Sequence, residues 1–135
     1  MSIRTDLTKL SVLSTVTIFV LSAVTMLLVS FGTAQADNFG AIAYSRAAGT
    51  HGYSYNYATQ WAAENRALQE CERYSGTGDC QILVWFKNGC GALAEGDSGY
   101  GTGWGANQTL AERYALESCS QYTTNCRITR SVCTN

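Results

Sequence analysis

The sequence lacks the residue patterns of metal and cofactor sites. It holds a single histidine, His51, and none of its six cysteines belongs to a C-x-x-C pair. Zinc sites in small domains use such pairs or closely spaced Cys and His ligands. The G-x-G pattern in residues 99–105 does not resemble a phosphate-binding loop, because a strand rather than a helix N-terminus follows it. We therefore expect neither a metal nor a cofactor.

Positive charge is also scarce. Residues 37–135 carry seven Lys and Arg side chains against nine Asp and Glu, and no run of like charges occurs. So few cations cannot form the basic face that nucleic-acid binding requires. The composition therefore argues against a nucleic-acid partner, and the lack of charge runs argues against a charged tail.

The N-terminus has the order of a secretory signal. Arg4 and Lys9 precede an uncharged run of 22 residues, 10–31, and Ala34-Gln35-Ala36 follows it. This order predicts a signal peptide over residues 1–36, cleaved before Asp37. The run is also long enough to span a bilayer, so an uncleaved membrane anchor is the alternative. In both cases residues 37–135 lie outside the cytoplasm.

Two segments of the chain repeat one helix. Residues 60–74 and 108–122 are identical at seven of fifteen positions, and the shared residues include positions spaced i, i+4, i+8 and i+11. That spacing places them on one stripe of an α-helix, where small side chains allow a close approach to a sheet. The stripes are Ala63, Ala67, Cys71, Tyr74 and Ala111, Ala115, Cys119, Tyr122. Either Asn107 or Thr109 with Glu112 can cap the second helix.

The repeat extends beyond the helices. GAIA (40–43) matches GALA (91–94), and each is followed by a second expected strand, 52–57 or 100–105. After each helix come a cysteine and an apolar strand, 80–86 or 126–132. The unit is strand–strand–helix–strand, repeated over about 39–88 and 89–133. We expect a single α+β domain over residues 37–135 with about six strands, and two helices packed on the sheet faces.

The second strands of the two repeats have complementary patterns. Residues 99–105 alternate glycine with larger side chains, whereas residues 52–57 carry three tyrosines on one face. Glycine inside a strand is unfavourable unless another group approaches closely there. At an offset of 48 residues each tyrosine corresponds to a glycine. We expect the tyrosine rings of one hairpin to lie over the glycine face of the other. The alternative is that each set packs under its own helix.

Residues 96–99 read Gly-Asp-Ser-Gly, the tetrapeptide around the nucleophile of trypsin-like proteases. His51, Asp79 and Ser98 occur in the chain order of such a triad, but the domain is too short for the two barrels that hold it. The tetrapeptide falls between two expected strands, where turn residues are common. We therefore assign it to a turn and expect no catalytic residue.

Two further candidates have ordinary explanations. Glu95 and Asp97 are close enough in sequence to suggest the paired carboxylates of a glycosidase, but a solvated turn explains them better. Trp85 lies in a nearly continuous apolar strand and is expected in the core.

Several segments together resemble a known family. They are FGAIAYS (39–45), VWFKNGCGALA (84–94) and GYGTGWG (99–105), with the six cysteines. This pattern is similar to the secreted bacterial family catalogued as domain of unknown function number four-one-eight-nine, over about residues 39–133. The resemblance implies an exported, disulfide-bonded α+β domain. It implies no catalytic residues, because the family has no assigned activity.

These observations favour a non-enzymatic module that binds a protein or a glycan outside the cytoplasm. Tyrosine and tryptophan supply amphipathic contact area for such binding. Contact with the membrane is expected only through the N-terminal segment, if it is not cleaved. The alternatives are an envelope structural protein and a small hydrolase. The candidate contact residues are His51, Tyr53, Tyr55, Tyr57, Tyr100 and Trp104.

All six cysteines lie in residues 37–135, and an even count in a short exported chain is typical of a disulfide framework. The repeat constrains the pairing, because equivalent cysteines should form equivalent bonds. Cys71 and Cys119 end their helices, and Cys80 and Cys126 begin the strands that follow. The expected disulfides are therefore Cys71–Cys80, Cys119–Cys126 and Cys90–Cys133.

Proteolysis of the oxidised protein under non-reducing conditions should release one linked peptide pair from each repeat. Mass spectrometry of the digest should identify Cys71 linked to Cys80 and Cys119 linked to Cys126. A peptide that links Cys71 to Cys119 would refute the pairing.

Overall fold

The structure, a computed structural model, describes residues 35–135, of which Ala36–Asn135 form one compact unit. The expected signal peptide over residues 1–36 lies almost entirely outside the described residues. Neither helix of residues 35–135 is long and apolar enough to cross a membrane. The elements are β1 (Phe39–Ser45), β2 (Thr50–Tyr57), α2 (Gln60–Ser75), β3 (Gln81–Lys87), β4 (Cys90–Glu95), β5 (Tyr100–Gly105), α3 (Gln108–Ser120) and β6 (Arg127–Cys133).

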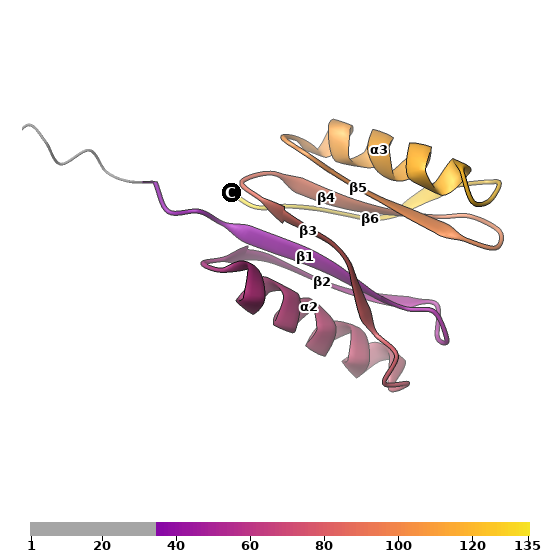
Figure 1. The fold of residues 1–135 in the computed structure, drawn as a ribbon, viewed down its shortest axis with the longest axis horizontal. Helices are drawn as coiled ribbons and strands as arrows, with labels where there is room; N and C mark the ends of the chain where they lie inside the picture. Colours follow the sequence, from indigo (N-terminus) through magenta and orange to yellow (C-terminus); the bar gives the residue numbers. More distant parts are fainter. Residues whose placement is uncertain (1–34) are drawn as a thin grey trace, which may run out of the picture. The chain divides into compact units, whose positions relative to one another are not determined.

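The domain consists of two similar β-β-α-β units, as the repeat predicts. Each unit forms a three-stranded antiparallel sheet with its first strand in the centre, in the orders β2-β1-β3 and β5-β4-β6. The sheets face one another, with β1 near β4, β2 near β6 and β3 near β5. Figure 1 shows α2 and α3 on the two outer sides of the paired sheets. The expected α+β class and duplicated unit are confirmed.

Each helix lies close to its sheet because only small residues separate them. In the first unit, Ala63, Ala67 and Cys71 of α2 pack on Ala41 and Ala43 of β1, and all five are fully buried. The second unit repeats this layer with alanines of β4 and α3 and with Cys119. The sequence therefore predicted the buried stripe correctly, except at its last position.

That last position is a tyrosine in both helices, and both tyrosines are exposed. Tyr74 is 62% and Tyr122 is 73% exposed, although the helical spacing placed them against the sheets. Cys71 already lies over the first residues of β2, since its sulfur is 3.9 Å from the carbonyl oxygen of Thr50. One turn later the helix has passed the end of the sheet, so Tyr74 has no sheet beneath it.

The capping alternatives for the second helix are also resolved. The side chain of Asn107 accepts a hydrogen bond from the backbone N–H of Leu110 at 3.0 Å, so Asn107 is the N-cap of α3. Thr59 has the same role in α2, where its hydroxyl accepts from the N–H of Ala62. Such caps satisfy backbone donors that the first helical turn leaves free.

The expected packing of tyrosine rings over the glycine face is wrong. A Cβ atom on Gly101 would overlap the backbone of Cys119, and one on Gly103 would overlap the backbone of Ala111 and Ala115. The glycine face of β5 therefore lies under its own helix, α3, as the alternative proposed. Gly52 has the same position under α2.

The error comes from a one-residue slip in the alignment of the strands. Ala43 pairs with Gly52 in the first sheet, and the equivalent Ala94 pairs with Gly101 in the second. The offset between β2 and β5 is therefore 49 residues, whereas the helices repeat at 48. Because side chains alternate along a strand, a slip of one residue exchanges its two faces.

Tyr57 also lies on a different face from that expected. The pairing of β1 with β2 shifts between Phe39 and Ala41, and Asn56 has a positive φ of 60°. This bulge inserts an extra residue, so the alternation of faces is interrupted. Tyr57 consequently packs with the helix-side cluster, while Tyr53 packs between the sheets.

One phenylalanine fills the centre of the interface between the sheets. Phe86 of β3 is 1% exposed and packs with Ile42 and Leu93. Its ring lies against both Gly40 and Gly91, because a Cβ atom on either glycine would overlap it. These two glycines occupy equivalent positions in the GAIA and GALA segments, so one ring fills the space above both.

Trp85, the neighbour of Phe86, does not belong to the core as expected. It is 43% exposed and contacts Phe39, with 6.3 Å between the ring centroids. β3 is an edge strand, and Trp85 pairs with Ala41 on its helix side, where solvent reaches the ring, whereas Phe86 on the opposite face is buried between the sheets. The apolar composition of the strand shows neither its edge position nor which face is covered.

The disulfides join Cys71 to Cys80, Cys119 to Cys126 and Cys90 to Cys133, the three pairs expected from the repeat. The first two have the same Cα–Cα distance of 6.1 Å, in agreement with their equivalent positions. The third has no counterpart. Cys90 faces Cys133 across β4 and β6, where the first unit pairs Phe39 with Lys87.

Replacement of Phe86 with alanine should destabilise the domain strongly. The change removes a buried ring and leaves a cavity between the sheets, which typically costs about 3–5 kcal/mol. Urea unfolding of the oxidised protein measures this loss. Trp85→Ala is the matched control on the same strand and should cost much less, because Trp85 is partly exposed. Equal losses for the two variants would contradict the central role of Phe86.

Candidate functional site

The candidate contact residues expected from the sequence do not form one site. They are divided between β2, with His51, Tyr53, Tyr55 and Tyr57, and β5, with Tyr100 and Trp104. These strands are edges of different sheets, and β2 lies near β6 whereas β5 lies near β3. Among the six, only Tyr100 lines the groove described below.

The Gly-Asp-Ser-Gly segment is a turn between β4 and β5, as expected. Ser98 contacts Thr123, with 3.2 Å between the two hydroxyl oxygens. His51 accepts a hydrogen bond from Arg130, and Asp79 accepts from Ser45, from the backbone N–H of Ala47 and from Thr77 of its own loop. The three residues of the apparent triad therefore have separate partners. In residues 35–135 no three His, Cys, Asp or Glu side chains group in a way that could hold a metal.

An open groove of about 730 Å³ lies beside β5, at the end of the domain that carries the β1–β2 and β4–β5 turns. Its walls combine aromatic rings, hydroxyls, a guanidinium, carboxylates and glycine backbone. The lining residues are Tyr44, Arg46, Glu95, Gly96, Asp97, Ser98, Gly99, Tyr100, Gly101, Thr102, Ser118 and Tyr122.

A tyrosine–carboxylate pair from equivalent positions of the two units lies in the groove. The hydroxyl of Tyr44, near the end of β1, donates a hydrogen bond to Oε1 of Glu95 at the end of β4, at 2.7 Å. Burial and then this carboxylate raise the pKa of Tyr44 to about 12. Tyr44 therefore stays protonated at neutral pH and fixes one oxygen of Glu95, which leaves the other for a ligand.

Arg46, in the turn between β1 and β2, lines one side of the groove. Its Nε and Nη2 atoms donate to the hydroxyl of Tyr100 at 3.0 and 2.6 Å. The ring of Tyr100 lies 4.9 Å from that of Tyr44, centroid to centroid. No carboxylate of residues 35–135 lies within salt-bridge distance of Arg46. Its remaining N–H groups are therefore free to bind a polar ligand.

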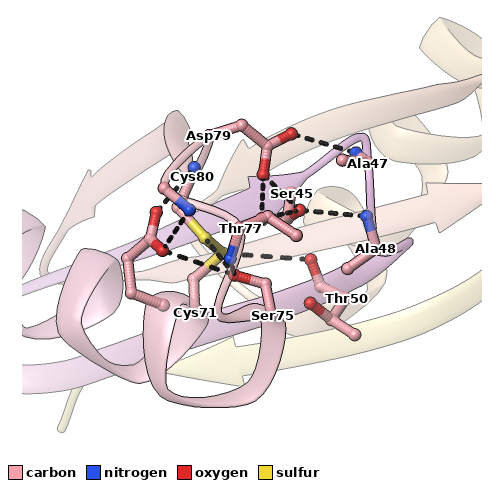
Figure 2. The surroundings of a disulfide bond; sticks show 11 residues. Ser45, Ala47, Ala48, Thr50, Cys71, Ser75, Thr77, Asp79 and Cys80 are labelled. Atoms are coloured by element: carbon pink, nitrogen blue, oxygen red, sulfur yellow. Dashed lines mark hydrogen bonds between the residues drawn. A yellow bond between two sulfur atoms is a disulfide. The ribbon is translucent and has the colours of Figure 1, made fainter.

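The first disulfide and its loop hold the turn that carries Arg46. Figure 2 shows Asp79, next to Cys80, in contact with Ser45 and with the backbone N–H of Ala47, which lies 2.9 Å from Oδ2 of Asp79. Thr77 also donates to Asp79. These hydrogen bonds lower the pKa of Asp79 to about 2, those from Ser45 and Thr77 most strongly.

In the second unit the loop after the helix also holds the turn between the first two strands, but the carboxylate lies in the turn and the donors lie in the loop. There the acid, Asp97, lies in the turn and accepts hydrogen bonds from Thr124 at 3.1 Å and Asn125 at 2.7 Å in the loop that follows α3. One oxygen of Asp97, Oδ2, is therefore bound within the fold. Tyr44 likewise holds one oxygen of Glu95, so the protein partly occupies both carboxylates, which argues against a catalytic pair formed by Glu95 and Asp97.

Sequence reasoning missed Tyr44 and Arg46. A usable signal existed, because Tyr44 and Glu95 are equivalent residues at the ends of the GAIA and GALA strands, 51 positions apart. A polar pair at matching positions of two facing sheets is a reasonable candidate for contact. Arg46 lies in a turn, and nothing in its local sequence indicates that it reaches the other sheet.

Two facing β-β-α-β units, closed by three disulfides and carrying an open polar groove, define a small disulfide-stabilised α+β domain. The chain belongs to the family described as Domain of unknown function (DUF4189), whose model matches residues 39–133. The family that the sequence resembles is thereby confirmed.

Mycobacterial proteins are similar to this chain. It is 42% identical over 81 residues to Protein Rv1269c of Mycobacterium tuberculosis and to Protein Mb1300c of Mycobacterium bovis. The match covers 60% of this chain and 60% of each curated relative, so it spans less than two thirds of their length. The NMR structure of Rv1813c from Mycobacterium tuberculosis is similar with a TM-score of 0.49 and 30% identity, over 71% of this chain and 74% of that one.

Replacement of Asp79 with asparagine should lower the melting temperature at pH 7, and the difference should shrink as the pH falls. A carboxyl with a depressed pKa stabilises the fold above its unfolded pKa of about 3.9 and loses this effect as the pH falls through its folded value, here about 2. Thermal melts of both proteins between pH 7 and 2 measure the difference. A difference that stays constant over this range would contradict the role of the Asp79 carboxylate.

Proposed function

We propose that residues 37–135 act outside the cytoplasm as a non-enzymatic module that binds a glycan in the groove beside β5. Three disulfides in a domain of this size support the location, because such bonds persist in oxidising compartments. The N-terminal order of charged residues, apolar run and Ala34-Gln35-Ala36 supports export.

The chemistry of the groove supports a polyhydroxylated ligand. The ring of Tyr122 is 73% exposed at its margin and can stack on the apolar face of a sugar. The free oxygen of Glu95 and the free N–H groups of Arg46 can accept from and donate to sugar hydroxyls. The mixture of one cation and two carboxylates favours a neutral ligand over a strongly charged one.

We favour binding over hydrolysis because the candidate catalytic groups within residues 35–135 are not arranged for a reaction. A nucleophile needs a base within hydrogen-bond reach, and a glycosidase needs two free carboxyl groups. Ser98 contacts Thr123 rather than His51, and one oxygen of Asp97 is bound by the loop that follows α3. Binding without reaction is the function that this arrangement supports best.

The single observation that carries the proposal is the exposed ring of Tyr122 beside hydrogen-bonding groups from both units. Its twin, Tyr74, is exposed to a similar degree but lies outside the groove. The repeat therefore supplies a matched control at the equivalent helix position.

Isothermal titration of the oxidised domain with neutral oligosaccharides, such as tetramers of glucose and of N-acetylglucosamine, should show saturable binding to at least one. Tyr122→Ala should raise the Kd about threefold to tenfold, because an aromatic contact contributes about 0.5–1.5 kcal/mol. Tyr74→Ala should leave the Kd unchanged. Equal effects of the two variants, or no saturable binding to any neutral oligosaccharide, would refute the proposal.

A further inference from the structure

The arginines of the domain fall into two groups. Arg66, Arg73 and Arg113 each have a carboxylate within 4 Å, as does Lys87. In residues 35–135 no such partner lies beside Arg46, Arg127 or Arg130. Arg46 belongs to the groove, whereas Arg127 and Arg130 both lie on β6, the edge strand near β2.

Arg130 is half-buried and held in place by two contacts with β2. Its Nε donates a hydrogen bond to Nε2 of His51 at 3.1 Å, and its guanidinium carbon lies 4.4 Å from the centroid of the Tyr53 ring. Neither Nη atom has a hydrogen-bond partner among the described residues. The end of the guanidinium that binds oxyanions in bidentate fashion is therefore unoccupied by the fold.

The repeat shows that packing does not require a cation at this position. Arg130 pairs with Leu93 in the second sheet, and Val84 pairs with the equivalent Ile42 in the first. Val84 packs with the apolar cluster between the sheets. A half-buried charge without a counter-ion is unfavourable, so replacement of a valine by an arginine here needs a compensating interaction.

The neighbouring charges favour an anion. Arg127 pairs with Glu95 and Arg130 with Leu93, and because the register of β6 shifts between these pairs, both arginines lie on one face; Arg127 is exposed. Glu95 is the carboxylate on this face, and one of its oxygens is bound by Tyr44. Burial and then Arg130 lower the pKa of His51, so His51 is neutral at pH 7 and accepts the Arg130 hydrogen bond. Two guanidiniums therefore outnumber one carboxylate.

We propose that Arg130 and Arg127, with Arg130 oriented by His51 and Tyr53, form a binding site for an oxyanion group at the β2–β6 edge. The ligand class is a carboxylate, phosphate or sulfate group carried by a larger molecule. Arg130 binds two of its oxygens through Nη1 and Nη2, and Arg127 supplies a second, exposed cation. This site goes beyond the neutral-glycan groove beside β5, which it adjoins at Glu95.

The test uses the oxidised domain at constant ionic strength and follows His51 ring protons and Arg130 Nε–H by NMR. Sodium phosphate, sodium sulfate and sodium acetate are titrated against sodium chloride as the background salt. At least one oxyanion should produce saturable shifts at both residues, with the Kd in the millimolar range. The salt with the lowest Kd shows whether the site prefers a phosphate, a sulfate or a carboxylate group.

Variants separate the site from general salt effects. Arg130→Val, which installs the residue of the twin position, should fold as well as the wild type and weaken binding at least tenfold. Arg130→Lys keeps the charge but loses the bidentate fork and should also weaken it. Arg113→Gln, which removes a paired arginine on α3, should have no effect.

Several results would overturn the proposal. One is a linear change of the NMR shifts with anion concentration, without saturation. Another is a Kd that Arg130→Val leaves unchanged, and a third is a loss of affinity in Arg113→Gln equal to that in Arg130→Val. Tyr122→Ala should leave oxyanion binding unchanged, so a failure of this proposal and a failure of the neutral-glycan proposal are distinguishable.

Discussion

The packing of one ring against two glycines determines how the halves of this domain meet. Phe86 lies between Gly40 and Gly91, which are equivalent residues of the two central strands. A side chain on either glycine would displace the ring and separate the sheets. There is room for one such ring, and the position equivalent to Phe86 holds the smaller Val132. The interface is thus necessarily asymmetric between units that are otherwise alike.

Away from this contact the two units have diverged where packing permits it. The helix–sheet layers cannot vary much, because alanine, glycine and cysteine leave no space for larger groups. Exposed strand ends are less constrained. Phe39 and Lys87 of the first unit occupy the positions equivalent to Cys90 and Cys133 of the second. The first unit therefore has an aromatic–cation contact where the second has a disulfide. The turns of the groove and Arg127 lie at positions of this freer kind, whereas Arg130 is half-buried within β6.

Much of the architecture could be predicted because it is local. Helix stripes, caps and the cysteines that follow each helix recur at fixed spacing, and local disulfides must form within each copy. The candidate sites could not be predicted in this way. Tyr44 meets Glu95, and Arg130 meets His51, only because two sheets face each other. The residues of the first pair are 51 positions apart in the sequence and those of the second are 79 apart, so local periodicity carries no sign of either contact.

The sequence by itself determined the duplicated β-β-α-β unit, its small-residue helix faces and its two local disulfides, because each follows from repetition and short-range spacing. The third disulfide, Cys90–Cys133, was then the one pair that remained. Tertiary structure decided which face of each strand is buried and by what. A bulge at Asn56 and a change of offset from 48 to 49 residues reversed the expected faces, since strands alternate with a period of two. It also decided that Trp85 is exposed and Phe86 is buried, because the covering of each face of an edge strand depends on strand order and packing rather than on composition.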